Sequence, residues 1–243
     1  MSDFFLAGVV WEPFKHWPIW RFLLEGLLVA LRIAVVSMLL SVVIGVVMAV
    51  GRLGHSRLVR WPATTYVEGF RATPLLLLML FVFFGSARAH AGIGPIASVI
   101  VALTLYNSAV LAEIVRAGIL SISRGILEAT RALGLTYLQA MRYVAIPMAL
   151  RRMAPGVVSQ LITLFKDTSL ASVLSILELS RRGRVIYDTP TYGNPLEVLT
   201  VVAALYFVPS YALSLLAQHL EGGPEGRRRP LLEAPAIKAE PTP

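Results

Sequence analysis

Cysteine is absent from the 243 residues, and lysine accounts for only 3 of the 22 basic residues. Without a thiol, the chain can form no disulfide, use no thiolate nucleophile and hold no zinc ion through cysteine. Charged residues are also scarce, at 15% of the chain, whereas ordinary soluble domains carry roughly 25%. This shortage argues against a water-soluble globular protein.

Apolar residues are abundant: they make up 56% of the chain, whose mean hydropathy is +0.71. A helix needs about 20 residues to cross the hydrocarbon of a bilayer. Five stretches reach that length, at about residues 23–50, 66–87, 93–115, 155–177 and 196–219. The sequence therefore predicts an all-α integral membrane protein with five transmembrane helices.

Three regions follow from this pattern. Residues 1–22 hold three tryptophans and are expected to lie at the outer membrane interface. Residues 23–221 form the transmembrane domain, with a long polar loop at about 120–150 between the third and fourth spans. Residues 222–243 are rich in proline, glycine and charge, which predicts a disordered tail.

Basic residues are distributed unevenly over the two faces that five spans define. Thirteen of them fall on the face that holds the long loop and the tail, and six fall on the other face. The positive-inside rule then places the N-terminus outside and the C-terminus in the cytoplasm, although the cluster RRGR at 181–184 opposes it. The net charge of +8 indicates no nucleic-acid partner, because the basic residues form no patch interleaved with aromatics.

The long loop contains a charged segment, EATRALG, at residues 128–134. Helical periodicity over residues 121–133 puts four apolar side chains on one stripe, namely Ile122, Ile126, Ala129 and Leu133. Glu128 lies at pairing distance from both Arg124 and Arg131. Gly134 suits a left-handed C-terminal cap, and Thr136 with Gln139 forms a capping box that starts a second helix. Two interpretations remain: an amphipathic loop on lipid headgroups, or a helix that docks a cytoplasmic partner.

A family resemblance favours the docking helix. The segment EATRALGLTYLQAMRYVAIP resembles the signature loop of importer permeases of the ATP-binding cassette class, with matches at Glu128, Ala129, Gly134 and Pro147 and a departure at Thr130. The flanking segments RATPLLLLMLFVFFG and LFKDTSLASVLSILELSR are similar to those of the polar amino-acid permease branch. Together the resemblance covers roughly residues 23–221.

This resemblance implies a type I importer permease with a MetI-like fold in a bacterial inner membrane. It implies a second permease, identical or similar, two cytoplasmic ATPase subunits and an extracytoplasmic solute-binding protein. Glu128, Ala129, Arg131 and Gly134 would form the coupling helix on the ATPase. No G-x-x-x-x-G-K-[ST] motif occurs, so ATP and Mg²⁺ are expected on the ATPase, with no cofactor and no enzymatic activity in this chain.

Polar residues within the fourth span indicate a solute route, because such residues are costly in a membrane. Gln160, Thr163 and Asp167 share one helical face, and Lys166 overlaps it. Asp167 and the residues after it favour a helix start, so the span is expected to break near Lys166 and to aim a half-helix N-terminus at the cavity. A solute α-carboxylate would then lie near Lys166 and its α-ammonium near Asp167. Alternatively, Lys166 and Asp167 form a buried pair or a helix cap that holds the kink.

Other polar positions have a structural interpretation, either alone or beside a functional one. By resemblance, Thr73 and Asn107 line the route, whereas plain inter-helix hydrogen bonding is the alternative. Glu25 is expected to pair with Arg32 or with another neighbour. The neutral amide of Gln160 favours neutral or acidic amino acids as cargo. The four histidines show no metal-ligand spacing.

Rival functions remain open. The coupling loop also fits a permease for another small polar solute, such as phosphonate or methionine. An ATP-independent carrier or channel would need no ATPase, and carriers often contain internal repeats, which this sequence lacks. A membrane-bound enzyme would need a reactive constellation, and no nucleophile–base pair stands out.

Overall fold

The computed structural model describes residues 11–54, 56–189 and 195–221, and every regular element in those ranges is helical. The predicted disordered tail and the first ten residues lie outside them. The elements are η1 (Glu12–Lys15), α1 (Trp17–Leu53), α2 (Arg57–Ala72), α3 (Leu75–Arg88), α4 (Pro95–Leu120), α5 (Arg124–Ala132), α6 (Tyr137–Ala140), η2 (Met141–Ala145, a π-helical turn), α7 (Ile146–Asp167), η3 (Thr168–Leu174), α8 (Leu179–Tyr187) and α9 (Pro195–Glu221).

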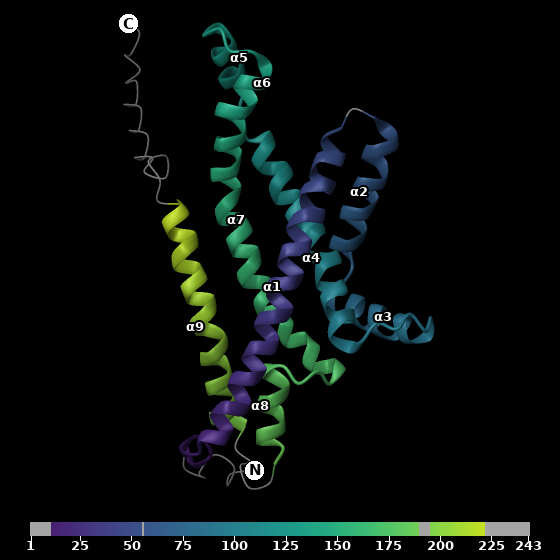
Figure 1. The fold of residues 1–243 in the computed structure, drawn as a ribbon, viewed down its shortest axis with the longest axis vertical. Coiled ribbons are helices and arrows are strands. Elements are labelled where there is room, and N and C mark those ends of the chain that lie inside the picture. The colour runs from purple at the N-terminus through teal and green to yellow at the C-terminus, as the bar shows by residue number, and fades with distance from the viewer. Residues whose placement is uncertain (1–10, 55, 190–194, 222–243) are drawn as a thin grey trace, which may run out of the picture.

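The long helices spread from one end of the molecule to the other (Figure 1). Helices α5 and α6, the turn between α1 and α2, and the C-terminal end of α9 all lie toward one end. Helix α8 and the start of α1 lie at the opposite end. The α1–α2 turn and the polar loop, which both carry several basic residues, therefore lie toward the same end, whereas the basic tail lies outside the described residues.

Four helical segments in the described ranges are long and apolar enough to cross a membrane, or five if one bent pair counts as a span. The bent pair is α2 with α3, which meet at 105°. The span predicted over residues 66–87 is therefore strongly bent. The bend arises at Thr73, whose backbone is extended because the following Pro74 disfavours the α-helical conformation there.

The fourth span is also longer than predicted. Its helical path runs over Tyr137–Leu174 and does not begin at Pro155, which lies inside α7. Pro147 lies directly after the π-helical turn of η2 inside this path, where its ring leaves one helical hydrogen bond unmade. The span thus reaches back to the capped start of α6 and joins the polar loop directly to the membrane segment.

Helix α1 packs along α4 through small side chains. Its buried face repeats Ala30, Ala34, Ser37, Ser41, Gly45 and Ala49. At Gly45 an added Cβ would lie 2.9 Å from Cβ of Leu111 and 3.0 Å from the carbonyl oxygen of Ser108. Membrane helices associate mainly by such close packing, because lipid is as apolar as the helix surface.

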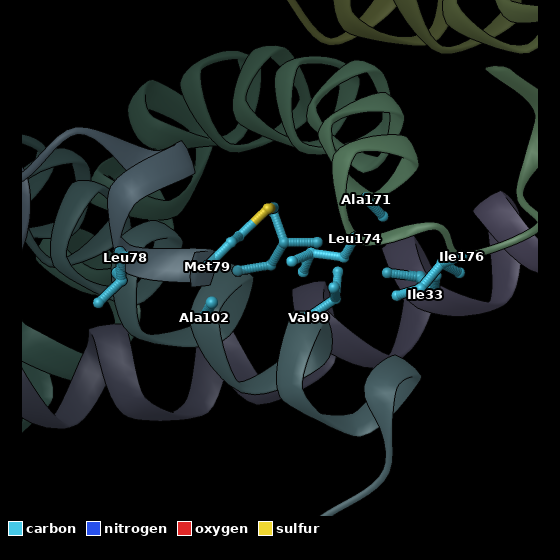
Figure 2. Packing of buried hydrophobic residues seen from close by; sticks show 9 residues of the cluster. Ile33, Leu78, Met79, Val99, Ala102, Ala171, Leu174 and Ile176 are labelled. Carbon is cyan, nitrogen blue, oxygen red and sulfur yellow. The ribbon is translucent and has the colours of Figure 1, made fainter. Parts of the chain in front are cut away.

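A second contact joins the bent pair to the rest of the bundle. Met79 of α3 and Leu174 of η3 point toward one another, with Val99 of α4 beside them (Figure 2). Met79 and Val99 are fully buried, and Ile33 of α1 completes the same cluster. Helix α3 is thereby anchored to α4 and η3 despite its bend away from α2.

The end that carries α8 is tied by charged groups. Arg182 of α8 donates to Glu25 of α1 at 2.9 Å and to the carbonyl oxygen of Phe22, also at 2.9 Å. Glu25 also pairs with Arg21 at 3.1 Å, which leaves Arg32 outside this network. Glu25 therefore pairs with Arg21 and Arg182 and not with Arg32. Through Arg182, the basic cluster at 181–184 has a structural role.

Glu178 caps α8 from a fully buried position. Its carboxylate accepts the backbone N–H groups of Ser180 and Arg181 at 2.9 and 2.8 Å, and the hydroxyl of Tyr206 in α9 at 2.6 Å. Burial raises the pKa of Glu178, and the three hydrogen bonds act in the opposite direction. The capped helix is thus fixed between α1 and α9.

Gly26 offers a test of the α1–α8 contact. A Cβ there would lie 2.8 Å from Cδ of Arg182 and 3.0 Å from backbone atoms of Leu179. We expect Gly26→Ala to destabilise the protein by about 1–3 kcal/mol, because the backbones have no room to give. Gly69→Ala is the matched control, since nothing lies within 4 Å of a Cβ in that exposed part of α2. It should be neutral or stabilising by about 0.5–1 kcal/mol.

The midpoint of thermal unfolding in detergent measures both variants. Equal midpoints for Gly26→Ala and Gly69→Ala would contradict the close α1–α8 packing.

Candidate coupling loop and solute route

The polar loop between α4 and α7 is a compact helix–turn–helix. Helix α5 ends in a left-handed turn at Gly134, whose φ is +83°. The N–H of Gly134 donates to the carbonyl of Arg131 at 2.9 Å, and the N–H of Leu135 donates to that of Thr130 at 3.2 Å. These two bonds define a Schellman cap, so the predicted role of Gly134 is confirmed.

The predicted capping box of the next helix is also confirmed. The N–H of Thr136 donates to Oε1 of Gln139 at 2.8 Å, and the N–H of Gln139 donates to Oγ1 of Thr136 at 3.4 Å. Only Leu135 separates this box from the Schellman cap. Two complementary caps so close together hold α5 and α6 at a fixed angle.

The charge pairs predicted on α5 do not form. Among the described residues Glu128 has no ion pair, and its side chain is exposed, as are those of Arg124 and Arg131. The helix begins at Arg124, with three residues between it and the end of α4 at Leu120, and not at Ser121. Glu128 is therefore a free carboxylate on the outer surface of the loop.

The apolar side of α5 also differs from the predicted stripe. Thr130 is buried and Ile126 and Leu127 are half-buried, whereas Ala129 and Leu133 are exposed. Three large side chains around the turn are strongly exposed: Leu133 at 80%, Leu138 at 78% and Tyr137 at 62%. The predicted stripe is therefore only partly covered by the chain itself, which leaves Ala129 and Leu133 exposed.

Helices α4 and α7 flank this loop and pack antiparallel against each other. A Cβ on Gly118 of α4 would lie 3.0 Å from Cβ of Met153, and a Cβ on Gly156 of α7 would lie 3.2 Å from Ile114. Near the loop, Arg152 donates to the carbonyl of Ser121 at 2.6 Å. The two helices thus stay in close contact along their length from the loop to Gly156.

The same register brings together two residues of the predicted route. Nε2 of Gln160 donates to Oδ1 of Asn107 at 2.6 Å, and Nδ2 of Asn107 donates to the carbonyl of Leu103 at 2.8 Å. Asn107 is fully buried and Gln160 is half-buried. In this conformation Asn107 therefore cannot touch a solute itself, whereas Gln160 presents part of its amide outside the α4–α7 contact.

The other predicted residues of the fourth span lie further along α7. Thr163 is half-buried, and its hydroxyl donates to the carbonyl of Ser159 at 3.1 Å. Lys166 is exposed and Asp167 is half-buried, and no hydrogen bond or ion pair joins them in the described structure. The alternative of a buried Lys166–Asp167 pair is therefore wrong.

The expected break at Lys166 is wrong as well. Helix α7 ends at Asp167, but the chain continues directly into the 3₁₀ turns of η3, with helical backbone angles at Asp167 and Thr168. Asp167 caps no half-helix by its side chain. The free helix N-terminus appears later, at Leu179, where Glu178 already satisfies it.

Thr73 lies away from these residues, at the bend between α2 and α3. Its hydroxyl donates to the carbonyl of Gly69 at 2.9 Å, which satisfies the side chain locally. The structure therefore brings Asn107 and Gln160 together and leaves Thr73 apart.

Comparisons with known proteins agree on one family. Residues 41–222 match the family described as "Binding-protein-dependent transport system inner membrane component". The chain belongs to this family. It is 39% identical over 201 residues to the probable glutamine ABC transporter permease protein GlnP of Bacillus subtilis (strain 168), covering 82% of this chain and 92% of the relative.

Two further comparisons support the same family assignment. It is 36% identical over 208 residues to the glutamate/aspartate import permease protein GltK of Escherichia coli O6:H1, covering 82% of this chain and 92% of that protein. A solved structure titled "Crystal structure of an amino acid ABC transporter with histidines" contains a similar chain, with a TM-score of 0.80 and 29% identity. That match covers 88% of this chain and 99% of the other.

One charged cluster of the permease escaped the sequence analysis. Arg52 of α1 donates to Glu113 of α4 at 2.8 Å and to Glu68 of α2 at 2.9 Å, and Arg116 and Arg71 also reach Glu113. An acidic residue such as Glu113 is unusual in an apolar helix, but nothing in the sequence indicates that its partner, Arg52, lies 61 residues away. The cluster fixes three helices at the end where the loop lies.

Gly134 and Gly125 together test the turn of the permease loop. We expect Gly134→Ala to destabilise the α5–α6 turn by about 1 kcal/mol, because alanine disfavours a φ of +83° even though no atom lies within 4 Å of its Cβ. Gly125→Ala, inside α5 with equally open surroundings, should stabilise that helix.

Amide hydrogen exchange of residues 124–140 measures both effects. Faster exchange for Gly134→Ala and slower exchange for Gly125→Ala are expected, and the reverse order would contradict the Schellman cap.

Proposed function

We propose that this permease carries polar amino acids inward through a bacterial inner membrane, driven by ATP that a separate ATPase subunit hydrolyses. The observation that carries the proposal is the rigid α5–α6 loop between α4 and α7, with Glu128 unpaired and Leu133, Tyr137 and Leu138 exposed. Such a surface suits burial against a protein, because apolar contacts supply affinity and a free carboxylate supplies orientation.

The loop is placed to transmit motion. It is covalently continuous with α4 on one side and with α7 on the other, and Arg152 ties the ends of both helices together. A partner that displaces the loop therefore displaces the two helices that hold Asn107 and Gln160. ATP and Mg²⁺ would bind to the ATPase, whose closure would turn the permease from inward-facing to outward-facing.

The cargo assignment rests on the polar positions of α7. Gln160, Thr163, Lys166 and Asp167 are all at least partly accessible, and they span about 10 Å along the helix. An amino acid carries an α-carboxylate that suits Lys166 and an α-ammonium that suits Asp167. The relatives named for glutamine, for glutamate and aspartate, and for arginine support an amino acid as cargo, and the neutral amide of Gln160 favours a neutral or acidic one.

The partners and the orientation complete the proposal. The family description names a binding protein, and we infer that it delivers cargo at the end that carries α8. The loop, the α1–α2 turn and the C-terminal end of α9 would then face the cytoplasm, with the N-terminus outside. A second permease, identical or similar, would complete the route.

Glu128→Gln tests the coupling role. In proteoliposomes with the cognate ATPase and binding protein, we expect ATP-driven uptake to fall about tenfold or more, because a charge-assisted contact worth about 1.5–3 kcal/mol is lost. ATP hydrolysis should persist. Glu12→Gln is the control, since Glu12 is an exposed carboxylate at the far end whose pair with Lys15 contributes little.

Unchanged uptake by Glu128→Gln, with a normal amount of assembled complex, would count against the coupling assignment.

Gln160→Glu tests the route. A carboxylate in this half-buried position should raise the uptake of arginine relative to glutamine by about tenfold, because opposite charge attracts strongly where water is excluded. Gln218→Glu makes the same change on an exposed position near the end of α9 and should leave the preference as it is. Competition between labelled arginine and glutamine measures the ratio, and an unaltered ratio removes Gln160 from the route.

A further inference from the structure

The charged cluster around Glu113 contains ion pairs within one helix and ion pairs between helices. Arg116 reaches Glu113 from three residues further along α4, so this pair stays within α4. Arg52 of α1 holds two carboxylates at once: Nη1 donates to Glu113 of α4 at 2.8 Å, and Nη2 donates to Glu68 of α2 at 2.9 Å. Arg71 of α2 lies 4.0 Å from Glu113, which is a longer contact. Arg52 therefore joins α1, α4 and α2 through one side chain.

The chemistry and burial of Arg52 suit a bridge between two acids. Its side chain is only 12% exposed, whereas that of Glu68 is 59% exposed. A guanidinium group is planar and presents separate N–H groups in a fixed fork, whereas a lysine ammonium is a compact point charge. Ionisable residues in membrane-spanning helices are costly and usually serve a function. Arg52 is thus a shielded bridge whose geometry lysine cannot reproduce.

Helices α1 and α4 move together without any ion pair, because small side chains let their backbones pack closely. At Gly45 of α1, an added Cβ would lie 3.0 Å from the carbonyl oxygen of Ser108 in α4. A backbone contact of this kind leaves no space in which one helix could shift without the other. The α1–α4 pair is therefore one mechanical unit, and α4 connects it to the α5–α6 loop.

Helix α2 is held to this pair less firmly by packing. It buries two of its 16 residues, whereas α4 buries 12 of its 26. The hydroxyls of Tyr66 in α2 and Ser108 in α4 form one neutral hydrogen bond at 2.7 Å. Of the two ion pairs that join α2 to its neighbours in the described part of the chain, Arg52–Glu68 is the shorter. The position of α2 relative to the pair thus depends strongly on Arg52.

We propose that Arg52 is a positioning residue that makes α2 follow the α1–α4 pair when the α5–α6 loop is displaced. The inference rests on the proposed function and identifies how motion reaches the bent second span. Glu113 lies about two turns before Leu120, where α4 ends and the loop segment begins. Helix α2 leads through the bend at Thr73 into α3, so a displaced α2 also displaces α3. Without the bridge, α4 moves and α2 lags behind.

The absence of cysteine allows a direct test of this motion. A single cysteine that carries a bimane label is placed either at Ala72, the last residue of α2, or at Leu120, the last residue of α4, and both positions are exposed. The labelled permease is assembled with its ATPase in nanodiscs and trapped with ATP and orthovanadate. We expect bimane emission to shift at both positions. In Arg52→Gln the shift at Leu120 should persist, and that at Ala72 should be about twofold smaller or less.

Arg116→Gln is the matched control. It removes the same charge and also takes one arginine from Glu113, but it breaks no contact between helices. The shifts at Ala72 and at Leu120 should therefore both persist. Arg52→Lys keeps the charge without the fork, so it should also reduce the shift at Ala72.

Transport gives an independent readout of the same variants. In proteoliposomes with the cognate ATPase and binding protein, glutamine taken up per ATP hydrolysed should fall about fivefold or more in Arg52→Gln, a typical size for coupling between distant sites. It should stay within about twofold of the wild type in Arg116→Gln. The midpoint of thermal unfolding shows that each complex is folded, and Arg52→Lys provides the test if Arg52→Gln does not assemble.

The outcomes separate this role from a merely structural one. A full shift at Ala72 in the assembled Arg52 variant overturns the proposal, and so does an equal loss in Arg116→Gln, because the charge around Glu113 would then matter and not the bridge. Loss of the shift at Leu120 in the Arg52 variant also contradicts it, since the loop itself would no longer respond. Absence of ATP-driven uptake by the wild type, with both labels responding as expected, overturns the proposed function and leaves the role of Arg52 standing.

Discussion

The close antiparallel packing of α4 against α7 is the contact on which the rest of this permease depends. Gly118 and Gly156 let the two helices approach, because any larger side chain would meet its neighbour at 3.0 to 3.2 Å. Helices in lipid gain no hydrophobic free energy by meeting, because lipid is equally apolar. Their association therefore depends on such van der Waals contacts and on hydrogen bonds. The loop at one end of the pair and the Asn107–Gln160 bond further along are therefore parts of one rigid unit.

Ion pairs hold the bundle at both ends and leave the middle to small and apolar side chains. Arg52 joins three helices near the loop, and Arg182 joins α8 to α1 at the other end. Charged groups are costly in hydrocarbon unless they are paired, which explains why these networks lie toward the ends of the spans. Between them the amide of Gln160 donates to Asn107 across the α4–α7 contact.

The sequence was informative wherever one local rule decided the outcome. The capping box of Thr136 and Gln139 and the left-handed turn at Gly134 follow from contacts within five residues, and both are confirmed. Predictions that needed knowledge of distant neighbours did worse. Glu128 was expected to pair along its own helix, and a half-helix was expected after Lys166. Both predictions are wrong, because periodicity shows neither what covers a surface nor how a helix continues.

Composition and spacing alone determined that this chain is an all-helical membrane protein, where its polar loop lies and how that loop is capped. They did so because hydrophobic length and local hydrogen bonding act along the chain. Only the tertiary structure decided that Glu113 meets Arg52, and that Asn107, whose amide donates to the carbonyl of Leu103, meets Gln160. Those features arise where helices meet, and the pairing of residues far apart in sequence is set by packing geometry.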